Sequence, residues 1–212
     1  NTFLENLDPY KRYFYASDIE EFSEYKYSID DAFKNPNFDF FDLVYERYKE
    51  RMSESEKIFN KILSTPFDFS KDEVCECDFE VLDYVQTNHE LYDRWRKLLK
   101  IYVIENYHNE IEDDLRKFEK DSLFQIRNLD LIEKETRESL SETMIQNYRF
   151  VSEEMQRSDW LSVYINSFVS QYDPNTSYLD PESKDRFDVD MSGNYAGIGA
   201  RLQKKIDKVE IT

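Results

Sequence analysis

Residues 38–63 read FDFFDLVYERYKERMSESEKIFNKIL, and this stretch decides the fold class because its apolar residues recur at intervals of three or four. Such spacing places side chains on one face of an α-helix. The stripe consists of Phe41, Tyr45, Tyr48, Met52, Phe59 and then Ile62 or Leu63. We therefore predict one long helix from about Phe38 to Leu63.

Three further stripes with helical spacing follow along the chain. They run through Leu91, Trp95, Leu98, Tyr102, Ile104, Tyr107, Ile111, Leu115 and Phe118, then through Leu140, Met144, Tyr148, Val151 and Met155, and finally through Leu161, Tyr164 or Ile165, Phe168 and Tyr172. Pairs typical of capping boxes, in which a side-chain oxygen satisfies first-turn N–H groups, predict helix starts at Ser17/Glu20, Ser70/Glu73, Thr87/Glu90 and Asp130/Glu133.

The glycines mark a change in the character of the chain. All three lie near its carboxy end, at Gly193, Gly197 and Gly199, so residues 1–192 contain none. Helices joined by turns need no positive φ, whereas sheets and phosphate loops usually need glycine. We therefore expect an all-α fold, an irregular multi-helix domain over residues 1–186.

The last residues, GIGARLQKKIDKVEIT at 197–212, alternate apolar and polar side chains with the period of a β-strand. This pattern predicts a β-hairpin. Because two strands alone are marginally stable, residues 187–212 are expected to be the truncated start of a β-rich module.

Charge excludes some classes of partner. The chain carries 46 acidic and 28 basic residues, a net charge of −18. Nucleic acids and anionic membrane surfaces are bound largely through Lys and Arg, so we expect neither as a partner. No apolar run is long enough to span a bilayer, and the given sequence opens on a helical pattern without a signal peptide. Cys75 and Cys77 lie too close in sequence for an ordinary disulfide, so they do not fix the redox compartment.

Two groups of residues resemble metal ligands. Glu105 and His108 form a Glu-x-x-His pair, but di-iron bundles need a second copy, and His89 has Gln86 three residues before it. Cys75, Cys77 and His89 offer at most three ligands without the spacing typical of zinc sites. We expect no metal and no cofactor.

Three other patterns are interpreted as polar surface. Asp173, Asn175 and Ser177 imitate the start of a calcium loop that then lacks its glycine and its final glutamate. Ser23 and Lys26 match Ser-x-x-Lys without the companion motifs of the penicillin-binding enzymes. A run of acids is expected to be a solvated helix face, namely Glu110, Glu112, Asp113 and Asp114. We expect no catalytic residue in this chain.

Three stretches together resemble the tail-specific branch of the carboxy-terminal processing serine proteases. They are LDPYKRYFYASDIEEF at 7–22, SVYINSFVSQYDPNTSYLDPE at 162–182 and FDVDMSGNYAGIGARL at 187–202. In the second, Asn175 stands where the family often has His. In the third, the pattern is similar to the family's transition into a PDZ domain, so the resemblance implies that residues 187–212 begin one.

The resemblance also implies a periplasmic or other cell-envelope protease. In that family a helical amino-terminal region packs around a PDZ domain and a core with a Ser nucleophile and a Lys general base. Its substrates are proteins recognised by apolar carboxy termini, and an envelope adaptor is a further partner to expect. The given chain ends before that core, so we expect it to be inactive alone.

One binding element is expected near the end of the chain. PDZ domains hold a peptide carboxylate with N–H groups of a glycine-containing loop. The candidate loop is Gly197, Ile198, Gly199 and Ala200, although these glycines equally suit a simple turn into a strand. For the helical domain we hypothesise an architectural role that shapes substrate access. The alternatives are an independent acidic interaction module without a protease connection and a metal-dependent helical enzyme.

Overall fold

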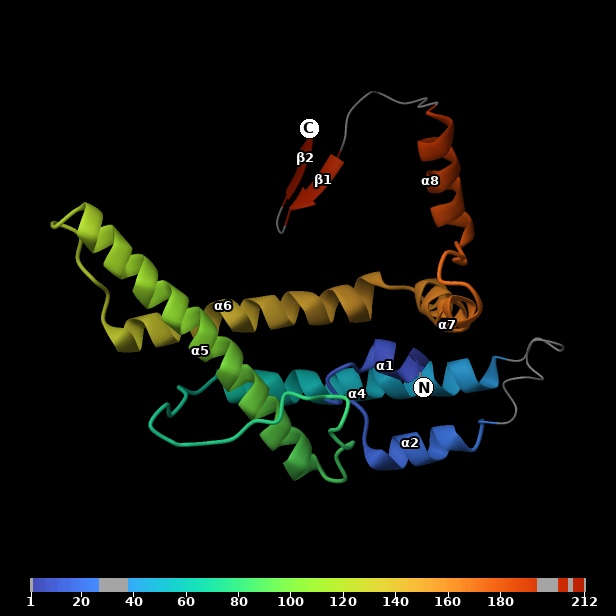
Figure 1. Cartoon of the computed structure of the whole chain (residues 1–212), viewed down its shortest axis with the longest axis horizontal. Coiled ribbons are helices and arrows are strands. Elements are labelled where there is room, and N and C mark those ends of the chain that lie inside the picture. The colour runs from blue at the N-terminus through green and yellow to red at the C-terminus, as the bar shows by residue number, and fades with distance from the viewer. Residues whose placement is uncertain (1, 27–37, 194–201, 206–207, 212) are drawn as a thin grey trace.

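The computed structural model describes residues 2–26, 38–193, 202–205 and 208–211, and most of them are helical (Figure 1). The helices are α1 (Thr2–Leu7), α2 (Ala16–Ser23), α4 (Asp39–Leu63), α5 (Asn88–Lys120), α6 (Leu129–Arg149), the π-helix η1 (Phe150–Glu154), α7 (Arg157–Tyr172) and α8 (Pro181–Ser192). The predicted all-α fold of the amino-terminal region is therefore confirmed. None of the described helices is both long and apolar enough to cross a membrane.

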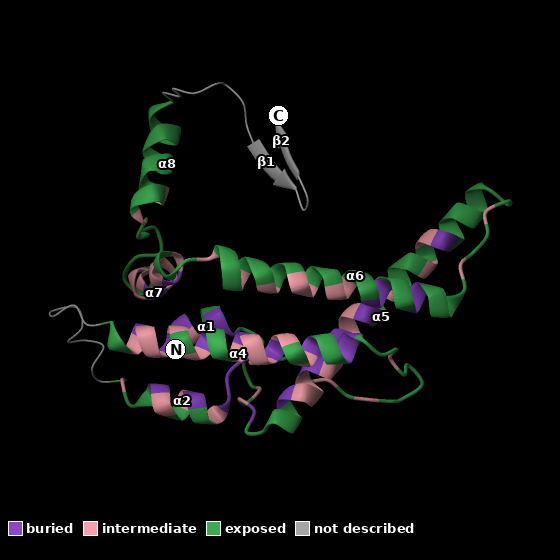
Figure 2. Ribbon diagram, turned by 180° about the vertical axis from the view of Figure 1, so that it is seen from behind, coloured by how far each residue is buried: buried purple, intermediate pink, exposed green. Residues whose placement is uncertain are grey.

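The long helix α4 is the axis of the bundle, as its sequence pattern predicts. Most residues of its stripe are buried, and the helix packs against α2, α5, α6 and α7 (Figures 1 and 2). The short helix α1 packs against α7 and α2 packs against α4, while α5 crosses α4 at an angle (Figure 1). Fully buried aromatic side chains fill the centre of the core, chiefly Phe14, Phe41 and Trp95.

The apolar face of helix α5 is buried only over its first half. Leu91, Trp95 and Leu99 are fully buried, whereas Leu115 and Phe118 are about half exposed. The stripe predicted for this helix continues into the second half, but the helix there extends beyond α4 beside the start of α6 (Figure 1). Helical spacing thus predicted the helix correctly and could not indicate how far its apolar face would be covered.

Of the predicted helix starts, one agrees with the structure and one near α2 does not. Thr87 caps α5 as predicted: its hydroxyl oxygen accepts the N–H of Glu90 at 3.2 Å, and Glu90 accepts the N–H of Gln86 at 2.8 Å. The predicted start at Ser17/Glu20 is wrong, because α2 begins at Ala16 and Asp18 accepts the N–H of Tyr15.

The other two predicted starts are also wrong. Helix α6 is capped by Asn128, which accepts the N–H of Asp130 at 3.0 Å. No helix begins at Ser70, because its hydroxyl donates to Asp68 at 2.6 Å and Glu73 binds cations of α5 instead. Residues 64–87 form a long connection without a helix or a strand.

At the carboxy end, β1 (Leu202–Lys205) pairs antiparallel with β2 (Lys208–Ile211), in the register Leu202 to Ile211. That these strands begin a PDZ domain remains a prediction. Helix α8 has no buried residue and ends at Gly193, whose φ of +66° suits glycine. This helix runs through residue 187, where the second unit is expected to begin, and the boundary itself also stays a prediction.

Candidate functional site

The turn that follows α1 is organised by one buried carboxylate. Asp8 accepts the N–H of Arg12 at 2.7 Å, of Tyr13 at 2.9 Å and of Phe14 at 3.0 Å. Its own carbonyl accepts the N–H of Lys11, which has a positive φ of 46°. Burial raises the pKa of Asp8, and the three N–H donors oppose that rise. The side chain thus replaces secondary structure as the acceptor for this segment.

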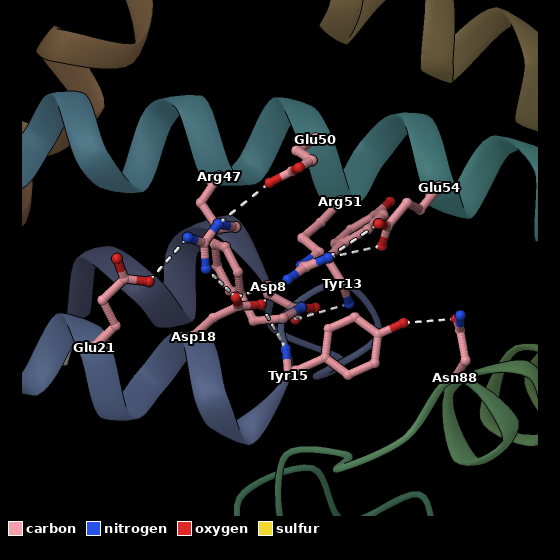
Figure 3. Close-up of polar contacts among 11 residues, drawn as sticks. Asp8, Tyr13, Tyr15, Asp18, Glu21, Arg47, Glu50, Arg51, Glu54 and Asn88 are labelled. Carbon is pink, nitrogen blue, oxygen red and sulfur yellow. Dashed lines mark hydrogen bonds and ion pairs between the residues drawn. The ribbon is translucent and has the colours of Figure 1, made fainter.

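A second buried carboxylate joins α2 to α4. Asp18 is fully buried, and its Oδ2 accepts the N–H of Tyr15 at 2.9 Å and Nε of Arg51 at 2.8 Å (Figure 3). Its Oδ1 accepts Nη2 of Arg51 at 2.9 Å and also Nη1 of Arg47. Burial acts to raise the pKa of Asp18, but the hydrogen bonds from Arg51, Tyr15 and Arg47 together lower it.

Hydrogen bonds also join the turn after α1 to α5. Trp95 donates its indole N–H to the carbonyl of Arg12 at 2.8 Å, and Arg94 donates to the carbonyl of Lys11 at 2.5 Å. The hydroxyl of Tyr15 donates to Asn88 at 2.7 Å (Figure 3). Because Asp8 and Asp18 are engaged by N–H and guanidinium donors, neither is available as a general base. The arrangement holds α1, α2, α4 and α5 together rather than performing acid–base chemistry.

Three similar polar clusters hold the outer elements. Arg127 binds Asp114 at 2.8 Å and so joins the loop before α6 to α5. Glu73 binds Arg96 at 2.6 Å and Lys100 at 2.8 Å, which fixes the long connection on α5. In the third cluster, Arg137 pairs with Glu133 at 3.0 Å and donates to the carbonyl of Leu63 at 2.6 Å, which fixes α6 at the end of α4.

Asp114 corrects one of our expectations. The acidic run at 110–114 was expected to be a solvated helix face, but Asp114 is fully buried under Arg127. Its neighbours Glu110 and Glu112 are exposed, and Asp113 is partly exposed. Arg127, thirteen residues away along the chain, supplies the counter-charge that allows this one acid to be buried, and no local pattern indicates that pairing.

We expect the free energy of unfolding to fall as the pH drops below about 3.8, the ordinary pKa of an aspartate. Hydrogen bonds from Arg127 lower the pKa of Asp114, and those from Arg96 and Lys100 lower the pKa of Glu73. With Asp18 these groups bind more protons when unfolded, so acid favours the unfolded chain. The raised pKa of Asp8 acts in the opposite direction only at pH values above 3.8, so it does not offset the loss expected below that pH. Urea unfolding at several pH values measures how the free energy of unfolding depends on pH. A free energy of unfolding that rises on acidification below pH 3.8 would contradict this expectation.

The candidate metal ligands do not come together. His108 is exposed and lies 3.2 Å from Glu112. Cys75 and His89 line one open cavity of about 710 Å³, whereas Cys77 is not part of its lining. Over the described ranges, no three His, Cys, Asp or Glu side chains are placed to hold a metal ion.

The remaining motif residues have local roles. Asp173 accepts the N–H of Asn175 at 3.0 Å and the hydroxyl of Thr176 at 2.6 Å, so the segment that imitates a calcium loop is a turn after α7. Ser23 donates to the carbonyl of Glu20 at 2.6 Å, and together with Lys26 it lines a cavity between α1, α2 and α7. The loop predicted to bind a peptide carboxylate, Gly197–Ala200, lies outside the described residues.

Sequence reasoning missed Asp8 and Asp18 as organising residues. The available signals were the Asp-Pro turn at Asp8 and an acid three residues after Tyr15, and both lie within the stretch 7–22 that carries the family resemblance. The partners of Asp18, in contrast, are 29 and 33 residues away on α4. Local spacing has no information about such pairs.

Comparison with known proteins agrees with the sequence resemblance. A family model described as the tail specific protease N-terminal domain matches residues 1–182. The Tail-specific protease of Haemophilus influenzae is 24% identical over 217 residues, which cover 99% of this chain. The chain spans 27% of the length of that relative.

Proposed function

Because the chain belongs to the family of tail-specific protease N-terminal domains, we propose that it is the non-catalytic, architectural region of a larger carboxy-terminal processing protease. Its role in that protein is to shape the access of substrates to the catalytic core. The remainder of the protein supplies the chemistry.

The observation that carries this proposal is the structural use of the family-like segment at 7–22. Asp8 and Asp18, its two aspartates, are buried and direct their oxygens at backbone N–H groups and arginines of the same chain. A catalytic carboxylate would instead face a site open to substrate. The segment therefore supports a scaffold that holds α1, α2, α4 and α5 in a fixed arrangement.

The activity of the whole protein follows by analogy with the family. We assign it a Ser nucleophile and a Lys general base beyond this chain, protein substrates recognised by apolar carboxy termini, an envelope adaptor and a periplasmic or cell-envelope location. Residues 187–212 are proposed to begin the PDZ domain, with the N–H groups of Gly197, Ile198, Gly199 and Ala200 positioned for a peptide carboxylate. The chain of 212 residues alone is proposed to be inactive.

Deletion of residues 1–186 from the parent protease tests the architectural role. We expect lower stability and a changed range of cleaved proteins, because the scaffold that limits access is missing. A short unstructured peptide ending in apolar residues is the control substrate, since it needs no guided access and its cleavage should change least. Unchanged stability, substrate range and processing would refute the role, and proteolysis by the purified 212-residue chain would refute its inactivity.

An independent interaction module is the second candidate, and exposed apolar side chains at the end of the α5–α6 pair favour it. Those side chains are Leu115, Phe118, Leu123 and Leu129. Replacing all four with Ser in the parent distinguishes the two functions. Normal processing combined with the loss of a bound protein partner would favour the module over the scaffold.

A further inference from the structure

A small cavity lies between the turn after α1 and the helices α4 and α6, and the turn organised by Asp8 forms one of its walls. Its volume is about 280 Å³. The walls are mostly aromatic and aliphatic, formed by Leu7, Pro9, Tyr10, Tyr13, Tyr48, Met52, Phe59, Met144, Tyr148, Phe150 and Val151. Such a volume is at the lower end of ligand pockets and suits a body the size of one aromatic side chain.

The charge of this cavity contrasts with that of the chain. The whole sequence has 46 acidic and 28 basic residues, yet Arg12 is the one charged residue among the described residues that line the cavity. Its guanidinium carbon lies 4.7 Å from the ring centre of Trp95 and 4.9 Å from that of Tyr10. Within the described part of the chain Arg12 forms no ion pair. Arg12 is therefore a cation held between aromatic rings, and it also interacts electrostatically with the buried carboxylate of Asp8.

Within the part of the chain that the structure describes, two buried polar atoms of the lining residues have no hydrogen-bond partner. They are Nε of Arg12 and Oγ of Ser55, and Ser55 is only 1% exposed. Buried donors without partners cost stability, and the great majority in native proteins are paired. Both atoms belong to residues that line the same cavity. A ligand bound in this cavity could therefore supply the missing hydrogen-bond acceptor to both of them.

The rim of the cavity has an irregular backbone. Phe150 and Val151 line it from the π-helix η1, where the regular hydrogen bonding of α6 ends, and Asn147 lies one turn before. Single π-turns of this kind are frequent at functional sites. Phe150 is about half exposed. The partly exposed side of the cavity thus lies at η1, close to the amide side chain of Asn147.

We propose that this cavity binds a carboxylate attached to a single apolar group. The guanidinium of Arg12 and the hydroxyl of Ser55 donate to the carboxylate oxygens, and the aromatic and methionine side chains enclose the apolar group. Both a free organic acid and the carboxy terminus of a polypeptide present this chemistry. The site is separate from the proposed PDZ loop at 197–200 and does not depend on the protease assignment.

Matched acids and amides test the proposal on the purified 212-residue chain. The probes are 3-phenylpropionate, a tripeptide ending in phenylalanine with a free carboxylate, and the amide of each. Chemical shifts of the Trp95 indole N–H report binding, because that group donates to the carbonyl of Arg12. We expect each binding acid to be at least about tenfold tighter than its amide. Binding of both acids supports a site for any carboxylate attached to an apolar group. Binding of only one shows whether the ligand is a free organic acid or the carboxy terminus of a polypeptide. If neither acid binds, or if acid and amide bind equally, the proposal is wrong.

Two substitutions separate binding from folding. Arg12→Met keeps an apolar side chain between the rings and should weaken the acid by about tenfold or more. Ser55→Ala should also weaken it, yet raise the urea midpoint of the ligand-free chain, because it removes an unpaired buried hydroxyl from a helix. Ser139→Ala on an exposed face of α6 is the control, with a gain in helix propensity alone and unchanged affinity. Unchanged affinity in Ser55→Ala would overturn the assigned role of its hydroxyl even if Arg12→Met fails to fold, and unchanged affinity in a folded Arg12→Met would overturn that of the cation.

Discussion

Replacing Asp18 with Ala is expected to lower the free energy of unfolding of this chain by about 3 kcal/mol. The side chain is fully buried, caps the first turn of α2 through Tyr15, and receives two arginines from α4. Its removal leaves Arg47 and Arg51 close together with only their more exposed partners on the helix surface. Urea denaturation followed by circular dichroism measures the change.

The matched control is Glu50→Gln, which removes an exposed partner of the same arginine. Glu50 lies 3.3 Å from Arg47, but its side chain is 63% exposed, so water replaces most of the interaction. We expect a change of less than about 0.5 kcal/mol. If Asp18→Ala and Glu50→Gln lowered the free energy of unfolding equally, the burial of Asp18 would not increase its contribution to stability.

The second large effect is expected for Asp8→Ala, at about 3 kcal/mol or more, because three backbone N–H groups lose their acceptor together. Two of these groups, those of Tyr13 and Phe14, are in buried residues, and each unsatisfied buried donor costs about 1–3 kcal/mol. Since the turn also carries the contacts to Trp95 and Arg94, we expect the amide protection of residues 12–15 to fall as well. Urea denaturation and hydrogen exchange give the two readouts.

The control for Asp8 is Asp42→Ala. Asp42 pairs with Arg157 at 2.5 Å, but both side chains are about half exposed, so less than about 1 kcal/mol is expected. If Asp8→Ala left stability and exchange at the level of this control, the turn would not be held by its carboxylate. The structural interpretation of the segment 7–22 would then be wrong, and with it the main support for an architectural role.

The family resemblance and the buried network meet in the same residues. Asp8, Tyr13 and Asp18 lie in the segment that resembles tail-specific proteases, and in the structure they connect α1 and α2 to α4 and α5. A segment of this kind is recognisable in sequence because its side chains have fixed partners.

Much of the secondary structure could be predicted from the sequence. The stripe of residues 38–63 gave α4 to within one residue, and the stripe from Leu91 to Phe118 lies wholly within α5. The start of α5 at Thr87 was also predictable, because a cap involves only neighbouring residues. Ser70 and Glu73 have the same spacing, yet no helix forms there, because Arg96 and Lys100 of α5 bind the glutamate.

The all-α class, the main helices and the family resemblance can be recognised from the amino-acid sequence alone. Helical periodicity, caps and family-like segments are encoded within a few turns of chain, so they can be identified without knowledge of the fold. The packing of the helices was needed to show that Asp18 contacts Arg51 on another helix, that Asp114 is buried under Arg127, and that Arg12 and Ser55 line one cavity. These groups are separated by 13 to 43 residues, and their burial depends on how helices pack, which no local pattern specifies.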